Sequence, residues 1–263
     1  MMLGIVGCAM FADEIVHAIE RDPDISMIYL IANADSDALK RKIEAVPQHP
    51  SVVMVERGQL RHLRDGPFSL LICMEPIALH EDPPHLREEV SKALAELTGA
   101  CSSILLFYGL CGNAFRDIQG LEERVGCPIT IIADESGRAV DDCVAAVLGG
   151  TDGYLGLLRR YPGVFYLTPA WAENWRDMMF KMEITRGVDR NDLSMIKWLF
   201  DTAGYELALK IPTGLGDQET FDRNVADFAK AFNFDIGELE KEKVTLDCIE
   251  RSYERAKGRL SLR

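Results

Sequence analysis

The sequence predicts an α/β fold: a mainly parallel, Rossmann-like sheet with helices on both faces and a helical C-terminal part. Over the first 150 residues, apolar runs alternate with segments of helical pattern, which is the βαβ rhythm of a parallel sheet. The chain has 263 residues, of which 48% are hydrophobic and 27% charged. That length and composition are typical of a soluble globular protein that buries a large core.

The apolar runs of the first 150 residues predict strands, and the segments between them predict helices. In the first of these helices, Ile15, Ala18 and Ile19 recur at the spacing of a buried helical stripe. In the third, Val90 and Leu94 do the same. We expect strands at 3–6, 25–32, 52–55, 68–73, 103–108 and 129–133, and helices at 11–21, 36–46, 85–98, 113–124 and 138–148.

A second region begins near Thr151, after a glycine pair suited to ending a helix. Thr168 and Pro169 fit the N-cap and first position of a helix whose apolar face could pack in the core or form a homo-oligomer contact. We expect strands at 164–167 and 205–211 and helices at 191–201, 217–232 and 244–257. No linker is visible, so 1–263 is predicted to be a single α/β domain, with a βαβ core at 1–150 and an extension at 151–263.

Charge and composition exclude several classes of partner. The net charge of −13 argues against nucleic acids and anionic membranes, because both favour clusters of Lys and Arg. No apolar run approaches the roughly 18–20 residues that span a bilayer, and the first residues lack the basic start of a signal peptide. We therefore expect a cytoplasmic protein. In a reducing cytoplasm, its seven cysteines are left for metal binding, catalysis or burial.

Three cysteines follow predicted strands. Cys8 comes directly after the first strand, Cys111 follows the run 103–110, and Cys143 lies ten residues beyond the run 129–133. Ligands of open α/β sheets bind outside the carboxyl ends of the strands, so these thiols are expected to converge. Together they predict a soft-metal site, either a zinc ion or an iron–sulfur cluster. Taken singly, each cysteine is more often a small buried hydrophobe than a ligand.

The strongest local motif surrounds Cys111. Gly109 and Gly112 flank it and would let the backbone turn tightly while a ligand approaches the thiol. A helix starting at Asn113 would direct its N-terminal dipole toward Cys111 and favour the thiolate, which makes Cys111 the candidate nucleophile. Gly109, Gly112 and Asn113 are therefore predicted to contact a cofactor. The alternative is a tight strand–helix turn with a buried cysteine.

Two further polar positions are candidates for chemistry. Glu14, at the start of the first helix, could support a cofactor beside Cys8 or simply interact with the helix dipole. His80 follows the strand that ends near Cys73 and could be a metal ligand or a proton carrier. It could equally belong to a rigid surface loop, since prolines follow at positions 83 and 84.

Several segments have a specific sequence, among them Phe107-Tyr108-Gly109-Leu110-Cys111-Gly112-Asn113, Asp142-Cys143-Val144 and Tyr161-Pro162-Gly163-Val164-Phe165-Tyr166-Leu167-Thr168-Pro169-Ala170-Trp171. Together these segments resemble the domain-of-unknown-function family 1638, over roughly residues 3–180. The resemblance implies an anaerobic cytoplasm and a link to corrinoid-dependent methyl transfer. It also implies a corrinoid protein or methyltransferase as a partner, and a small methylated compound as a substrate.

These observations lead to three hypotheses of different classes. The first is a cytoplasmic, cysteine-ligated metal or iron–sulfur protein linked to anaerobic corrinoid-dependent methyl transfer. The second is a metal-free enzyme that uses Cys111 as its nucleophile. The third is a non-enzymatic partner of a methyltransferase or corrinoid protein, in which the acidic surface and the pair Trp171 and Trp175 supply the contact.

Overall fold

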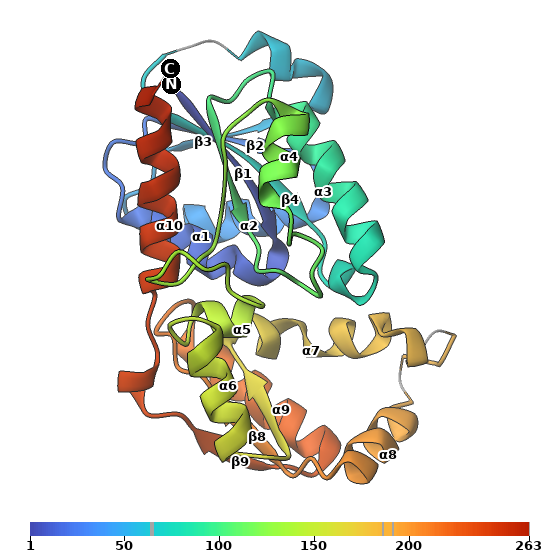
Figure 1. The fold of residues 1–263 in the computed structure, drawn as a ribbon. Helices are drawn as coiled ribbons and strands as arrows, with labels where there is room; N and C mark the ends of the chain where they lie inside the picture. The colour runs from blue at the N-terminus through green and yellow to red at the C-terminus, as the bar shows by residue number, and fades with distance from the viewer. Residues whose placement is uncertain (64–65, 186, 191, 263) are drawn as a thin grey trace.

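The computed structural model describes residues 1–63, 66–185, 187–190 and 192–262, and Figure 1 shows its two parts, each built on a parallel sheet. Within these ranges six strands form the larger sheet in the order β3-β2-β4-β1-β5-β6, and every neighbouring pair is parallel. The predicted fold class is confirmed. The strands are β1 (Met2–Cys8), β2 (Met27–Ile31), β3 (Ser51–Val55), β4 (Ser69–Glu75), β5 (Ser103–Phe107) and β6 (Ile129–Ile131).

Helices cover both faces of the larger sheet. Every residue of β1, β4 and β5 is buried, as expected for parallel strands enclosed on both sides. Figure 1 shows α1 and α10 on one side and α3 and α4 on the other, and α1 also contacts α2. No helix of the described residues is long and apolar enough to cross a membrane. The helices are α1 (Ala12–Glu20), α2 (Ala34–Glu44), α3 (Pro83–Leu97), α4 (Ile118–Val125) and α10 (Asp247–Gly258).

A smaller parallel sheet, in the order β7-β8-β9, forms the second part of the molecule. We call this sheet with α6–α9 the second lobe, and the larger sheet with α1–α4 and α10 the first lobe. The second lobe has an aromatic core in which Trp175, Phe228 and Phe232 pack edge to face. Its elements are α6 (Thr151–Arg160), β7 (Val164–Leu167), α7 (Pro169–Lys181), α8 (Ser194–Ala203), β8 (Leu207–Lys210), α9 (Gln218–Phe232) and β9 (Asp235–Glu238).

Short helical segments complete the chain. Three of them, η1, η2 and η3, follow strands of the larger sheet, and α5 lies between the lobes in Figure 1. After the second lobe the chain returns through α10, which contacts β5 and β6. The segments are η1 (Ala9–Phe11), η2 (Arg57–His62), η3 (Leu79–Glu81), α5 (Cys143–Ala146), η4 (Glu183–Thr185), η5 (Lys241–Lys243) and η6 (Arg259–Leu262).

The start of α7 follows the sequence prediction. The side chain of Thr168 accepts a hydrogen bond from the Trp171 N–H (3.3 Å), and Pro169 occupies the first turn. Trp175, Met178 and Met179 are each only 2% exposed, because α7 packs within the chain. The apolar face of this helix is therefore not available for a dimer, and Trp175 is not available to a partner protein.

Several predicted boundaries are wrong. The helix expected at 113–124 begins only at Ile118, because Cys111, Gly112 and Asn113 all have left-handed backbone (φ 44°, 67° and 67°). The helix expected at 138–148 shrinks to α5, because the preceding residues form backbone pairs instead, such as Ala139 with Ala133. The helix expected at 191–201 begins at Ser194, and its predicted first residue lies outside the described ranges. Neither α6 nor β9 was expected.

Ion pairs and a hydrogen bond made by lysine side chains connect the two lobes. On α2, Lys42 donates to Asp13 of α1 (2.9 Å) and to Glu173 of α7 (2.8 Å). Lys181 of α7 reaches the carbonyl of Ile77 in the first lobe (3.4 Å). These contacts join α7 to the carboxyl-end side of the larger sheet, so the second lobe forms a wall opposite the strand ends.

Candidate functional site

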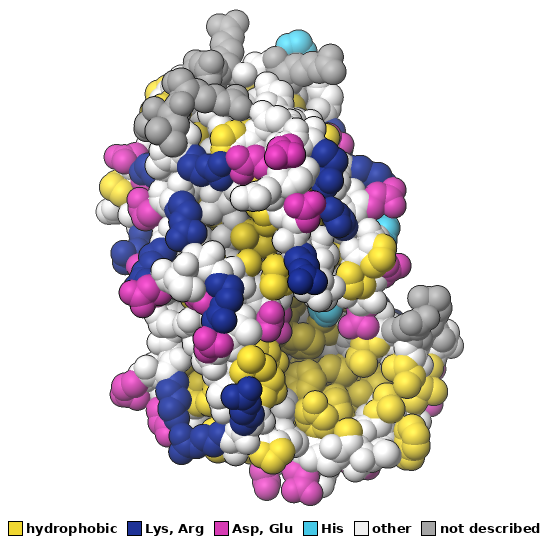
Figure 2. Space-filling view, viewed as in Figure 1, with side chains coloured by type: hydrophobic (Ala, Val, Ile, Leu, Met, Phe, Trp, Pro, Cys, Tyr) yellow, Lys and Arg dark blue, Asp and Glu magenta, His cyan; other side chains and the backbone are white. Residues whose placement is uncertain are grey.

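A cavity of about 480 Å³ lies between the carboxyl ends of the larger sheet and the second lobe. Figure 2 shows hydrophobic side chains gathered in a hollow between the two halves of the molecule. Both lobes contribute to the lining, which consists of Cys8, Met10, Phe11, Leu79, His80, Tyr108, Leu110, Cys111, Gly112, Asn113, Asp141, Asp142, Cys143, Val144, Tyr154, Leu158, Val164, Phe165, Tyr166, Trp171 and Tyr205.

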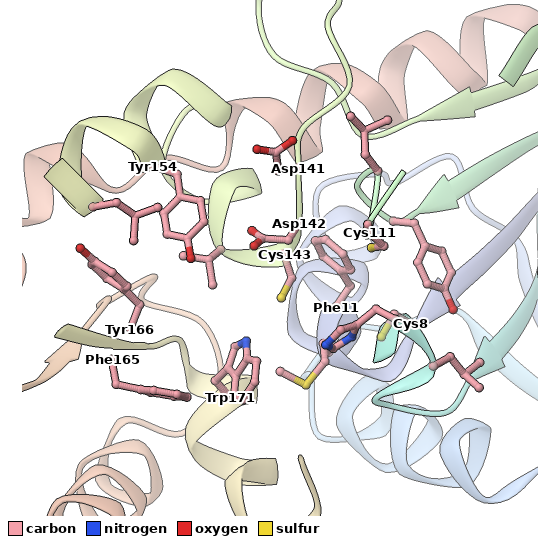
Figure 3. Close-up of a pocket in the computed structure, with 18 of the residues that line it drawn as sticks. Cys8, Phe11, Cys111, Asp141, Asp142, Cys143, Tyr154, Phe165, Tyr166 and Trp171 are labelled. Atoms are coloured by element: carbon pink, nitrogen blue, oxygen red, sulfur yellow. The ribbon is translucent and has the colours of Figure 1, made fainter. Parts of the chain in front are cut away.

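The three cysteines predicted to converge all line this cavity. Cys8 is the last residue of β1, Cys111 lies in the loop after β5, and Cys143 is the first residue of α5. Figure 3 shows their sulfur atoms around the same space. They surround it without gathering at one point: in the described ranges, no group of three or more His, Cys, Asp or Glu side chains is already arranged to hold a metal ion.

Backbone pairing brings Cys111 beside the segment that carries Cys143. The Leu110 N–H donates to the carbonyl of Val140 (2.8 Å), and the Cys111 N–H donates to the carbonyl of Asp141 (2.9 Å). The side chain of Asp142 then caps α5 by accepting from the Ala145 N–H (2.8 Å). Two loops far apart in sequence are thus held together at the strand ends, and each presents a thiol.

Gly109 allows this close approach. A Cβ at position 109 would lie 2.7 Å from backbone atoms of Asp141 and Asp142, which is closer than real Cβ atoms come. We expect Gly109→Ala to push the two loops apart and to lower the free energy of unfolding by about 1–3 kcal/mol, measured by urea denaturation.

A glycine with free space provides the matched control. Gly156 lies inside α6, and a Cβ there would meet nothing within 4 Å. Gly156→Ala should stabilise the protein by about 0.5–1 kcal/mol, because alanine has the higher helix propensity. Equal stabilities for the two variants would contradict the assigned role of Gly109.

The three thiols are protonated in the free protein at neutral pH. Burial raises the pKa of the Cys8 thiol to about 12. Burial, followed by the nearby Cys8 and Asp142, raises the pKa of Cys111, and burial with Asp142 raises that of Cys143 further. The expectation that a helix dipole would favour the Cys111 thiolate is wrong, because no helix begins at Asn113.

Some of the other predicted site residues line the cavity and some do not. Gly112, Asn113 and His80 line the cavity, and His80 lies in η3, with Nε2 3.5 Å from a carboxylate oxygen of Glu81. Gly109 and Glu14 are not part of the lining. Glu14 is only 4% exposed, and burial, with the neighbouring Asp13, raises its pKa to about 8.

Cys73, at the end of the predicted strand before His80, does not line the cavity. It is fully buried in β4 and its thiol donates to the Glu75 carboxylate (3.5 Å). It lies two residues before the end of β4, so its side chain packs on a face of the sheet and not beyond the strand end.

The second lobe supplies an aromatic wall that sequence reasoning missed. Tyr154 packs edge to face on Tyr166 (centroids 5.7 Å apart), and Phe165 packs edge to face on Trp171 (5.5 Å). Figure 3 shows these four side chains across the cavity from Cys8 and Cys111. For Phe165, Tyr166 and Trp171 the signal in the sequence is the aromatic content of the segment 161–171, which equally describes an ordinary core.

Comparison with known proteins identifies a family and nothing more. The family model described as "Protein of unknown function (DUF1638)" matches residues 74–253, which is more than half of the chain. The matched region includes Cys111, Cys143 and the aromatic wall but not Cys8. No curated protein and no solved structure matches the chain.

Proposed function

For this chain, which belongs to the DUF1638 family, we propose a cysteine-ligated soft-metal centre, held in the cavity by Cys8, Cys111 and Cys143. One observation carries the proposal: three thiols from three separate segments line a single cavity and surround the same space. Thiolates are the preferred ligands of zinc and of iron–sulfur clusters. With three protein ligands, the centre would keep one coordination position open toward the cavity.

The protonation state of the thiols favours metal chemistry over a metal-free nucleophile. A thiol whose pKa is raised by desolvation, as at the half-buried Cys111, is a weak nucleophile at neutral pH. A bound metal ion deprotonates its thiol ligands directly, so burial does not prevent ligation. Binding should then release protons and strengthen as pH rises.

The positions of the three thiols help to distinguish a zinc ion from an iron–sulfur cluster. Four-coordinate zinc requires sulfurs about 3.8 Å apart, as follows from Zn–S bonds of about 2.3 Å at tetrahedral angles. In the described residues the cysteines are not gathered in that way, so zinc would require their side chains to rotate inward. A polynuclear cluster places iron and sulfide atoms between its cysteine ligands and would need less rearrangement. Both remain within the proposal.

We also propose that the centre takes part in anaerobic, corrinoid-dependent methyl transfer, with a corrinoid protein or methyltransferase as its partner. The support is chemical: thiolate ligands are sensitive to oxygen, and the cavity of about 480 Å³ is large enough for a small methylated compound beside the open position. When bound, the metal would supply Lewis acidity toward a thiol or methyl acceptor. The chain itself would orient that molecule and exclude water.

Parallel purification in air and in an anaerobic chamber tests the proposal. The metal and sulfide content of each sample is measured per chain. Iron with sulfide in the anaerobic sample alone indicates a cluster, and about one zinc per chain in both samples indicates a mononuclear site. Protein free of metal from both routes, and unable to take up zinc or reconstituted cluster, would contradict the proposal.

A further inference from the structure

The part of the cavity formed by the second lobe is aromatic, and carboxylates lie beside it. Tyr154, Phe165, Tyr166 and Trp171 line it, and Figure 3 shows Asp142 above Cys143, with Asp141 farther above. Across the described residues, no Lys or Arg contributes to the lining, and His80 is its one side chain that can carry a positive charge. An anionic ligand would therefore find no permanent counter-charge there.

Asp142 is held in place as a potential counter-charge. Its carboxylate caps α5 through the Ala145 N–H (2.8 Å), which fixes its position beside Cys143. Asp142 also lines the cavity, so its carboxylate is placed to act as the counter-charge of a bound cation.

We infer that this aromatic and acidic half of the cavity binds a small organic cation carrying N-methyl groups. With a quaternary nitrogen such a cation has no N–H donors to satisfy, and its methyl groups pack on aromatic rings, which attract positive charge. Asp142 supplies the opposite charge. The inference names the substrate class of the cavity and rests on the proposed function only in sharing that cavity.

Calorimetric titration of the full chain with two compounds tests the inference. One is choline, and the other is dimethylbutanol, the neutral isostere of choline in which carbon replaces the ammonium nitrogen. Choline should bind about tenfold or more tightly than dimethylbutanol, because only choline gains the attraction of the rings and the carboxylate. Equal affinities, or no binding of either compound, would overturn the inference.

Two variants locate the binding. Asp142→Asn keeps a good helix cap but removes the charge, so it should weaken choline binding about tenfold and leave dimethylbutanol unaffected. Trp171→Leu should weaken choline binding similarly, whereas Trp198→Leu, at a position 62% exposed on α8, should not change it. Unchanged choline affinity in both Asp142→Asn and Trp171→Leu would contradict the assignment.

Metal content measured on the same samples separates this inference from the proposed function. Selective binding of choline by protein that neither contains nor takes up metal would leave the inference standing and contradict the metal centre. Metal-containing protein that does not distinguish choline from its isostere would overturn the inference and leave the metal centre standing.

Discussion

Cys111→Ser is expected to abolish metal binding while the fold survives. A serine hydroxyl is a poor soft-metal ligand, and Cys8 and Cys143 alone would leave the centre two protein ligands. The backbone bond from position 111 to the carbonyl of Asp141 does not involve the side chain, so the loop should keep its place. Metal content per chain should fall to background, with the far-UV circular dichroism spectrum unchanged.

A cysteine outside the cavity serves as the control. Cys248 is 2% exposed and packs in the core of the first lobe on α10. Cys248→Ser should keep its metal but lose about 1–3 kcal/mol of stability, because the buried hydroxyl gains no assured partner. If Cys111→Ser keeps its metal, or if wild-type protein has none and Cys111→Ser only lowers the melting temperature, Cys111 is a core residue and not a ligand.

The strands of the larger sheet could be predicted because their signal is local. The runs that form β1, β4 and β5 are buried on both faces, so nearly every residue is apolar. The strand β9 has no such signal. Its residues Asp235, Ile236 and Glu238 are exposed, and it pairs with β8 at the edge of the smaller sheet.

Helix starts near the cavity could not be predicted, because contacts distant in sequence decide them. The glycines and asparagine around Cys111 look like the turn before a helix, yet the loop bonds to Val140 and Asp141 instead. The same pairing keeps residues 139–141 extended and delays α5 until Asp142 can cap it. Hydrogen bonds between the backbone groups of two loops outweigh a local helical pattern in the sequence, because they already pair the N–H and C=O groups that a helix would pair.

The residues of the first lobe that line the cavity could be predicted, because ligands of open α/β sheets bind outside the carboxyl ends of the strands. The residues that the second lobe contributes could not. Cys8 ends β1 and Cys111 follows β5, and these strands are neighbours in the sheet, so the proximity of the two cysteines could be expected from parallel topology. Tyr166 and Trp171 belong to a different sheet and its following helix. Nothing in a single sequence states which face of a second lobe will cover the strand ends of the first.

The buried Glu14 should give the protein an unusual pH dependence of stability. Burial, then the charge of Asp13, raises the pKa of its carboxyl from 4.5 to about 8, although Lys42 acts in the opposite direction. In the folded state Glu14 therefore keeps its proton at pH values where the unfolded chain has lost it. This contribution to stability is fully present below pH 4.5, declines as pH rises from 4.5 to about 8, and is absent above that.

Comparison of wild type with Glu14→Gln isolates this contribution. Between pH 5 and 8 the free energy of unfolding of the wild type should fall more steeply than that of Glu14→Gln, by about 1 kcal/mol per pH unit. The quantity compared is the slope of the free energy of unfolding against pH, because the new amide changes stability by an amount that does not depend on pH. Urea denaturation at several pH values measures it for both proteins.

Glu20→Gln on the same helix is the matched control, since Glu20 is exposed and its substitution should leave the pH slope unchanged. Asp13 and Lys42 also influence Glu14, but both are present in all three proteins and so cancel in the comparison. If the free energy of unfolding varied with pH in the same way for wild type and Glu14→Gln, Glu14 would be ionised in the folded protein. In that case water or a rearranged Lys42 must reach its unpaired Oε2, and the carboxyl would not be enclosed behind the cavity as the structure has it.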